Sequence, residues 1–295
     1  MNELILWLKE REYFWQSPYL FANCSTIGCG GFSALAVYPK TKEELGALLR
    51  RLKSAKIDYY ILGNLSNVLP PPKMSSRVVV STKRLTQIAP ISGGVYAQAG
   101  VTSGALLRYC KQNGKSGVEF LTGIPCTLGG ALYMNAGVNG AHMQDIVQAI
   151  DVFYQGKLVS WQLNECEYAY KSSRFMKEDC AIVGARLNLL DATVEEVACR
   201  IKSYDERRAH LPKGKSMGCV FKNLNGESAG KWIEGAGLKG MAIGGAYVSK
   251  EHANFIINSG SATVEDICAL IRLIKNAVFA QYKVQLQEEI FVLNE

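Results

Sequence analysis

The chain has 295 residues, of which 48% are apolar and 20% charged, so it is long and apolar enough to form two or three folded lobes. Its net charge of +7 comes from Lys and Arg residues spread along the chain without a nucleic-acid-binding motif, so we expect no nucleic-acid partner. No run of about 18 apolar residues could cross a bilayer, and residues 1–14 lack a signal-peptide cleavage site, so we expect a cytoplasmic protein without membrane insertion.

Three helices are predicted by capping boxes, in which a Thr hydroxyl caps the first turn and an acidic residue lies three positions later. They begin at Thr41, Thr193 and Thr263. Strand-like runs bounded by Gly, Pro or Asn lie at residues 59–62, 77–81, 95–99, 146–154, 181–189 and 254–258. A helix between the first strands indicates a βαβ-like lobe, whereas the later strands follow one another without helices and indicate antiparallel pairing. We therefore predict an α+β fold with a domain boundary near residue 190.

Two glycine-containing segments are candidates for a ligand site. Residues 63–67 (GNLSN) follow an apolar strand, and such a turn either directs backbone N–H groups at an anion or is a plain surface turn. Residues 117–140 carry six glycines among bulky apolar residues, which indicates a buried backbone that passes close to something flat, or else tight packing between strands. No GxGxxG follows a strand, so a Rossmann dinucleotide site is disfavoured.

The cysteines and histidines give no metal pattern. Nine cysteines are scattered without a CxxC pair, and His142, His210 and His252 are isolated, so we expect no metal. Two other segments combine a cation or a proton carrier with aromatic residues: residues 170–175 (YKSSRF) and 216–223 (SMGCVFKN). Each is either a site for chemistry or a strand end with solvated charges.

In their order along the chain, these segments resemble the UDP-N-acetylenolpyruvoylglucosamine reductase family, whose FAD-dependent members make UDP-N-acetylmuramate for peptidoglycan. The matching pieces are TIGCGGFS at 26–33, LGNLSN at 62–67, EFLTGIPCTLGGALYMNAG at 119–137, YKSS at 170–173, GCVFKN at 218–223 and LQEEI at 286–290. The likeness spans nearly the whole chain and implies the compact form of the family, without an inserted tyrosine-bearing loop.

The resemblance also implies an architecture and a reaction. Residues 1–190 would form an FAD-binding region of the vanillyl-alcohol-oxidase type, with subdomains at about 1–85 and 86–190, and residues 191–295 a C-terminal α+β substrate-binding domain. NADPH would reduce FAD, and the reduced flavin would pass a hydride to the vinyl carbon of UDP-N-acetylglucosamine enolpyruvate. We expect a monomer whose other partners are this UDP-sugar and NADPH.

The resemblance assigns roles to individual residues. The family's stabilising arginine falls on Lys171, its proton-donating serine on Cys219 and its late catalytic glutamate on Glu289. The cofactor would contact Gly63, Asn64, Leu65, Ser66, Asn67, Gly123, Ile124, Pro125, Cys126, Thr127, Gly129, Gly130, Asn135, Ala136 and Gly137. Substrate contacts would come from Arg174, His210, Lys222, Asn223 and Tyr247.

Several of these residues depart from the family pattern. Lys171 keeps a positive charge but lacks the planar fork of arginine, which Arg174 could supply instead. An ordinary thiol, with a pKa near about 8.5, is mostly protonated at neutral pH, so Cys219 remains able to give a proton. Leu65 replaces a usual glycine, which an unstrained backbone at this residue would tolerate, and Tyr247 replaces a usual glutamine. The alternatives are an FAD-linked oxidase of the same fold and a non-catalytic flavin-binding relative.

Overall fold

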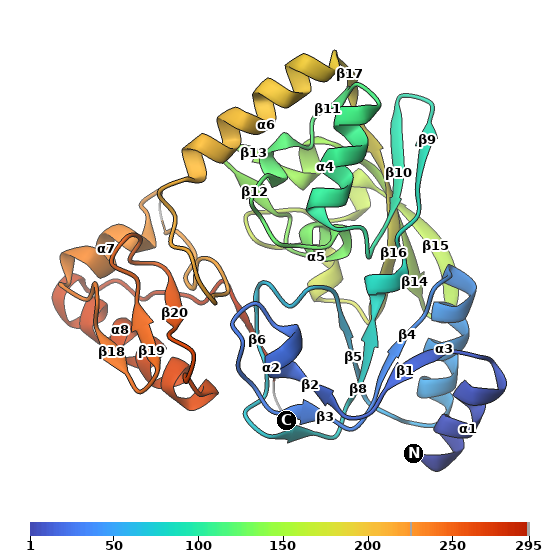
Figure 1. The fold of residues 1–295 in the computed structure, drawn as a ribbon, viewed down its shortest axis with the longest axis horizontal. Helices are drawn as coiled ribbons and strands as arrows, with labels where there is room; N and C mark the ends of the chain where they lie inside the picture. Colours follow the sequence, from blue (N-terminus) through green and yellow to red (C-terminus); the bar gives the residue numbers. More distant parts are fainter. Residues whose placement is uncertain (225, 294–295) are drawn as a thin grey trace. The chain divides into compact units, whose positions relative to one another are not determined.

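The chain divides into two compact units, which are described separately here (Figure 1). The computed structural model describes residues 1–224 and 226–293. The first unit comprises Met1–Gln16, Leu35–Asn64 and Val78–Ala209, and the second comprises Ser17–Ala34, Leu65–Arg77 and His210–Glu295. The division thus falls after Ala209 rather than near residue 190, and two early stretches of chain belong with the C-terminal residues.

The first sheet of unit 1 contains the expected parallel strands. Its order is β1 (Phe14–Gln16), β4 (Ala36–Tyr38), β8 (Val78–Ser81) and β5 (Tyr59–Leu62). Strands β4 and β5 both run parallel to β8, and helix α3 (Lys42–Ser54) connects β4 to β5. Thr41 caps α3 by accepting from Glu44 N, and the leucines of α3 share a buried core with Val78, Val80 and helix α1 (Asn2–Glu10). The predicted βαβ-like lobe is confirmed.

The second sheet of unit 1 is antiparallel throughout. Its order is β15 (Lys157–Gln162), β14 (Val147–Tyr154), β16 (Cys180–Asn188), β10 (Gly94–Gln98) and β9 (Ile88–Ile91). The expectation that no helix separates these strands is wrong, because α4 (Ser103–Gln112) and α5 (Leu128–Tyr133) lie between β10 and β14. Helix α4 is capped by Thr102 without an acidic residue three positions later, so the capping-box pattern missed it.

A partly buried polar cluster ties helix α6 (Val194–Arg208) to unit 1. Arg200 on α6 donates to the hydroxyl of Ser116, which itself donates to Glu119 Oε1 at 2.6 Å. The second carboxylate oxygen of Glu119 accepts from Gly117 N at 2.7 Å, and Glu119 is only 4% exposed. The capped helix after Thr193 therefore packs on unit 1 and is not the start of the second unit.

Unit 2 is built around helix α8 (Val264–Tyr282), which begins after the capping box at Thr263. Its three-stranded antiparallel sheet has the order β18 (Ala242–Ile243), β19 (Ala246–Val248) and β20 (Ile256–Asn258), and α7 (Ala229–Gly235) contributes to the same core. Ile27 and Leu69, from the two early stretches, are fully buried in this core. Strand β6 (Val68–Leu69) also pairs in parallel with β21 (Phe291–Val292), close to the end of the described chain.

The remaining elements are short. They are β2 (Tyr19–Leu20), α2 (Phe21–Cys24), β3 (Phe32–Ser33), β7 (Met74–Ser75), η1 (Thr82–Arg84), β11 (Lys115–Ser116), η2 (Glu119–Leu121), β12 (Gly137–Val138), β13 (Ala141–His142), η3 (Met143–Asp145), η4 (Leu163–Glu165), η5 (Arg174–Met176) and β17 (Leu190–Asp191). Among the described residues, no helix combines the length and the apolar character that a membrane span requires.

Candidate functional site

The turn that follows strand β5 leaves consecutive backbone donors without a protein acceptor. Within residues 1–224 and 226–293, the N–H groups of Asn64, Leu65 and Ser66 donate to no protein atom. Consecutive backbone N–H groups of this kind can receive an anion such as a phosphate. The side-chain amide of Asn64 donates to Pro125 O at 2.8 Å, so the start of this turn is tied to the glycine-rich segment of unit 1.

Leu65 lies in the left-handed region of backbone conformation, with φ +51°. Glycine adopts this conformation without cost, whereas a side chain with a Cβ pays about 1–2 kcal/mol. The side chain of Leu65 is 3% exposed, so its burial offsets that cost. An unstrained backbone was expected at Leu65, but the backbone is left-handed there. Burial of the leucine side chain compensates for the strain.

The loop at residues 122–127 is a compact series of turns. Ile124 N donates to Leu121 O at 3.1 Å, and Cys126 N donates to Ile124 O at 2.9 Å. Gly123 has φ +72°, which explains the need for glycine at that position. The pKa of the Cys126 thiol is raised to about 11, chiefly by burial, so this side chain stays protonated and packs as a small apolar group. The buried hydroxyl of Thr122 has no hydrogen-bond partner within the described part of the chain.

Helix α5, at the centre of the glycine-rich segment, has its first-turn donors satisfied by protein. Leu128 N and Gly129 N donate to Val101 O and Ala99 O, both at 2.8 Å, and Gly130 N donates to Thr127 Oγ1 at 3.4 Å. A Cβ on Gly129 would lie 3.0 Å from the Cβ of Ala99. Close packing therefore explains Gly129, and the free donors of the residue 64–66 turn are better placed than α5 to receive a phosphate.

Asn135 joins the end of the glycine-rich segment to the residues around Lys171. Its side-chain amide donates to Gln144 Oε1 at 2.7 Å and to Ala169 O at 3.1 Å, while its carbonyl oxygen accepts from Gln144 N at 3.1 Å. Asn135 is 2% exposed and has φ +45°. Ala136 and Gly137 follow directly, and Gly137 pairs with His142 between β12 and β13.

Lys171 occupies a tight turn in unit 1. Ala169 N donates to Ser172 O at 3.1 Å and Ser172 N donates to Ala169 O at 3.2 Å, which leaves Tyr170 and Lys171 between them. Lys171 has φ +50°, and the next buried hydroxyl, Ser173 Oγ, donates to Tyr133 O at 2.6 Å. The backbone of this turn is therefore fixed to the C-terminal end of α5.

The guanidinium of Arg174 is engaged elsewhere in unit 1. It lies 4.0 Å from the centre of the Trp161 ring, and its Nε lies 3.6 Å from Glu178 Oε1. It also donates to Glu165 O at 3.4 Å. These contacts hold the guanidinium against Trp161 and Glu178, which disfavours the idea that Arg174 supplies the guanidinium that Lys171 lacks.

In unit 2, Cys219 and Glu289 lie on neighbouring extended segments. Cys219 forms an antiparallel bridge with Phe255, just after Gly218, which has φ +77°. Glu289 N donates to Val220 O at 2.7 Å, and Phe221 forms an antiparallel bridge with Glu288. The backbone oxygen of Glu289 accepts from the side chain of Asn67 at 3.0 Å. Unit 2 thus brings together the predicted proton donor, the predicted carboxylate and Asn67.

The predicted substrate residues of unit 2 are dispersed along its chain. Lys222 follows the Cys219 segment, with its N–H donating to Gln287 O at 2.9 Å. The Asn223 side chain accepts from Ala229 N at 3.1 Å and so caps α7. Tyr247 lies in the middle of β19, opposite Ile257. His210 is exposed at the start of the C-terminal stretch.

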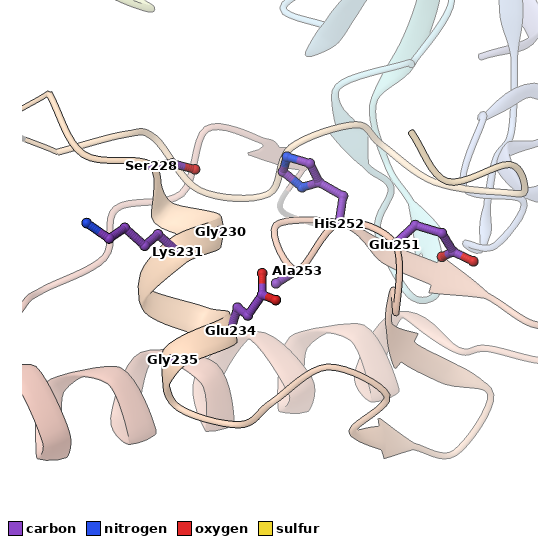
Figure 2. A pocket seen from close by; sticks show the side chains of 8 residues that line it. All are labelled: Ser228, Gly230, Lys231, Glu234, Gly235, Glu251, His252 and Ala253. Carbon is purple, nitrogen blue, oxygen red and sulfur yellow. The ribbon is translucent and has the colours of Figure 1, made fainter. Parts of the chain in front are cut away.

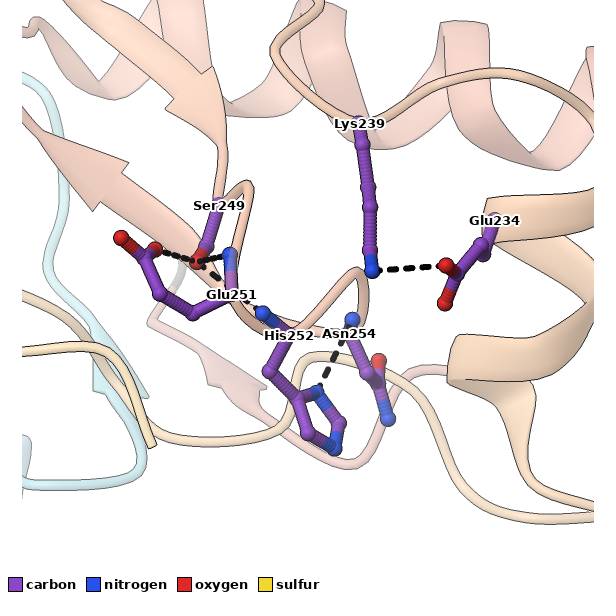
Figure 3. Close-up of polar contacts among 6 residues, drawn as sticks. All are labelled: Glu234, Lys239, Ser249, Glu251, His252 and Asn254. Carbon is purple, nitrogen blue, oxygen red and sulfur yellow. Dashed lines mark hydrogen bonds and ion pairs between the residues drawn. The ribbon is translucent and has the colours of Figure 1, made fainter. Parts of the chain in front are cut away.

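A group of polar residues around His252 carries no motif in the sequence and was not among the predicted site residues. Ser228, Lys231, Glu234, Glu251, His252 and Ala253 line an open cavity of ≈ 420 Å³ (Figure 2). The polar contacts of this region include Asn254 N donating to His252 Nδ1 at 3.3 Å and Lys239 paired with Glu234 at 2.7 Å (Figure 3). An isolated histidine without a motif gave no signal, because its neighbours come both from the turn between β19 and β20 and from the start and body of α7.

Two family models match the chain in order and define its class. The model described as an FAD binding domain matches residues 33–160, which include both the residue 63–67 turn and the glycine-rich segment. The unpartnered donors of Asn64, Leu65 and Ser66 fit the phosphates of this cofactor, and the buried hydroxyl of Thr122 offers a further polar group. The chain is a flavin-dependent enzyme with FAD as its cofactor.

The second model, described as the C-terminal domain of UDP-N-acetylenolpyruvoylglucosamine reductase, matches residues 209–293. Curated reductases of this name are similar over most of their length: that of Carboxydothermus hydrogenoformans is 36% identical, covering 93% of this chain and 92% of its own, and that of Protochlamydia amoebophila is 37% identical, covering 94% and 93%. The crystal structure of the Thermus caldophilus reductase matches with a TM-score of 0.83 and 31% identity, over 96% of this chain and 100% of its own. This chain belongs to the UDP-N-acetylenolpyruvoylglucosamine reductase family.

Proposed function

We propose that this enzyme reduces UDP-N-acetylglucosamine enolpyruvate to UDP-N-acetylmuramate with electrons from NADPH, and that Cys219, Glu289 and Lys171 carry the chemistry. The observation that best supports the residue assignment is the pairing of the Cys219 segment with the Glu289 segment inside unit 2. In the overall reaction the carbon–carbon double bond gains a hydride at its terminal carbon and a proton at the carbon next to the carboxylate.

FAD, when bound, would supply the hydride that the substrate receives, and NADPH would reduce the flavin again. The protein holds the cofactor through backbone and small side chains. The turn at Asn64, Leu65 and Ser66 supplies N–H groups for phosphate, and the loop at residues 122–127 lies against this turn through the contact between Asn64 and Pro125. Asn135 then connects that loop region to the turn that carries Lys171.

Cys219 is the proposed source of the proton. A neutral thiol is a stronger acid than a serine hydroxyl, so it can protonate the carbon next to the carboxylate as negative charge builds there. Lys171 stabilises the charge on the substrate carboxylate, as a single cation without the two parallel bonds that arginine would form. Glu289 completes the acid–base set as the carboxylate on the segment paired with that of Cys219.

The experiment separates the two halves of the reaction. Anaerobic mixing with NADPH bleaches the flavin, and addition of UDP-N-acetylglucosamine enolpyruvate restores its absorbance with formation of UDP-N-acetylmuramate. Cys219→Ser should keep this second step active, whereas Cys219→Ala should slow it by on the order of 10²–10⁴-fold, the usual worth of a general acid. Reoxidation only by oxygen would indicate an oxidase, and an Ala variant at full speed would exclude the role of Cys219.

The same proposal includes a monomer that works in the cytoplasm, where NADPH is available. The cytoplasmic location follows from the proposed use of NADPH, and the monomer is an expectation from the sequence. Light scattering after size-exclusion chromatography would test the oligomeric state against the chain mass of 32.4 kDa.

A further inference from the structure

The backbone that follows Cys219 is held by one buried residue, Asn254. Its carbonyl oxygen accepts from Phe221 N at 2.9 Å, its side-chain amide donates to Phe221 O at 2.8 Å, and its backbone oxygen accepts from Val220 N at 2.9 Å. Asn254 is 2% exposed, and the residue after it, Phe255, forms the bridge with Cys219. Three hydrogen bonds therefore fix the two residues that follow the proposed proton donor.

Asn254 is in turn placed by the preceding turn, and His252 is its partner there (Figure 3). Asn254 N donates to His252 Nδ1 at 3.3 Å. The turn is otherwise held by Ser249 Oγ, which accepts from Glu251 N at 3.1 Å and His252 N at 3.2 Å and donates to Glu251 Oε2 at 2.6 Å. The imidazole packs edge-on against Phe255, with ring centres 5.1 Å apart.

The hydrogen bond from Asn254 requires a lone pair on Nδ1, so the neutral ring carries its proton on Nε2. The pKa of His252 is lowered, first by burial and then by the nearby His210, with a smaller lowering from Lys239; a backbone hydrogen bond and Glu234 oppose the shift. Lys231 and Glu251 are the other charged residues of the adjoining cavity, which His252 itself lines (Figure 2). Protonation of Nδ1 would turn the acceptor into a donor that faces the N–H of Asn254.

We propose that Asn254 is a positioning residue for Cys219 and that neutral His252 holds Asn254 in place, so that protonation of His252 loosens the segment that delivers the proton. This inference rests on the proposed role of Cys219. A displacement of about 1 Å at a reacting group can cost on the order of 100-fold in rate, so a small movement of this segment is sufficient to matter.

The test measures flavin reduction by NADPH and flavin reoxidation by UDP-N-acetylglucosamine enolpyruvate as separate stopped-flow steps. Asn254→Ala should slow reoxidation by on the order of 10- to 100-fold and leave reduction within about twofold of wild type. Asn113→Ala is the matched control, because Asn113 is an exposed amide that donates to Tyr109 O at 2.8 Å in unit 1. It should change neither step.

A pair of histidine variants tests the proton dependence, and it remains informative if Asn254→Ala does not fold. An Asn side chain can accept from the N–H two residues on without titrating, so His252→Asn should reoxidise like wild type at about pH 7.5. Between about pH 7.5 and 5.5, wild type should lose reoxidation rate and His252→Asn should lose less. His252→Ala should be slow throughout this range.

The outcomes distinguish this inference from the function on which it rests. Slow reoxidation in Cys219→Ala together with wild-type rates in Asn254→Ala would overturn the positioning role and leave the proposed function intact. Equal acid losses in wild type and His252→Asn would overturn the part assigned to His252. Wild-type reoxidation in Cys219→Ala would remove the proposed proton donor, and the inference with it.

Discussion

At the scale of single residues, the positions that differ from the family pattern are accommodated by their surroundings in different ways. Leu65 keeps the left-handed backbone of a glycine and buries its side chain. Lys171 also has a positive φ, in a turn closed by two backbone hydrogen bonds. Both residues therefore hold a side chain on a left-handed backbone, Leu65 by burial and Lys171 within a closed turn.

Leu65→Gly should lower stability in spite of relieving the backbone. Relief of the left-handed conformation is worth about 1–2 kcal/mol, whereas truncating a buried leucine costs about 2–5 kcal/mol, so the net loss in free energy of unfolding should be about 2 kcal/mol. Urea denaturation of wild type and variant measures the difference. A variant more stable than wild type would mean that strain at Leu65 outweighs its packing.

The residues of the proposed site were predictable to different degrees. The resemblance to the reductase family implied Cys219, Glu289 and Lys171 as candidates, and the residue 63–67 turn could be read locally as an anion-binding turn. Asn254 could not be found in this way, because its contacts with Phe221 join positions 33 residues apart. The contact of Arg174 with Trp161 was equally hidden, because Trp161 lies on a strand outside the local motif; the substrate role of Arg174 stays a prediction.

At the scale of helices and strands, local patterns predicted the start of an element well and its packing poorly. The threonine caps at the starts of α3, α6 and α8 are all present. Helix α4 was missed because its cap lacks the acidic partner. Helix α6 falls in unit 1 rather than in the predicted C-terminal domain, and its contact there joins Arg200 to the buried pair of Ser116 and Glu119, which no periodicity in the sequence displays.

Glu119→Gln should weaken the attachment of α6. The amide that replaces one carboxylate oxygen would face either the Ser116 hydroxyl or the Gly117 N–H, so one buried hydrogen bond is lost at a cost of about 1–3 kcal/mol. Glu195→Gln, an exposed change in the first turn of α6, should stay within about 0.5 kcal/mol of wild type. Chemical denaturation compares the two variants. Equal effects would show that the buried cluster contributes no more than a surface charge.

At the scale of the whole chain, the composition and alternation of elements predicted an α+β fold, and the parallel and antiparallel sheets of unit 1 follow that prediction. The assembly of unit 2 from separated stretches could not be predicted. Ile27 and Leu69 are far in sequence from the α8 residues with which they share one core. The side chain of Asn258 donates to Ile27 O at 2.8 Å, and Thr26 Oγ1 donates to Ser216 O at 2.7 Å.

Residues 209–293, the stretch that the C-terminal family model matches, should therefore not fold by themselves. Without residues 17–34 and 65–77 the fragment loses part of its buried core and the parallel partner of β21. Circular dichroism during heating should give a cooperative transition for the full chain and a gradual change for the fragment. A sharp transition with native-like helix content in the fragment would contradict this expectation.

The three-stretch construction of unit 2 also has a consequence for synthesis on the ribosome. Residues 17–34 and 65–77 leave the ribosome early, and their partners from residue 210 onward do not yet exist. Synthesis of the intervening Val78–Ala209 takes on the order of ten seconds at about 5–20 residues per second. During that interval apolar residues such as Leu69 lack their final neighbours and are available to a chaperone. Unit 2 can close only after its last strand, Phe291–Val292, has emerged.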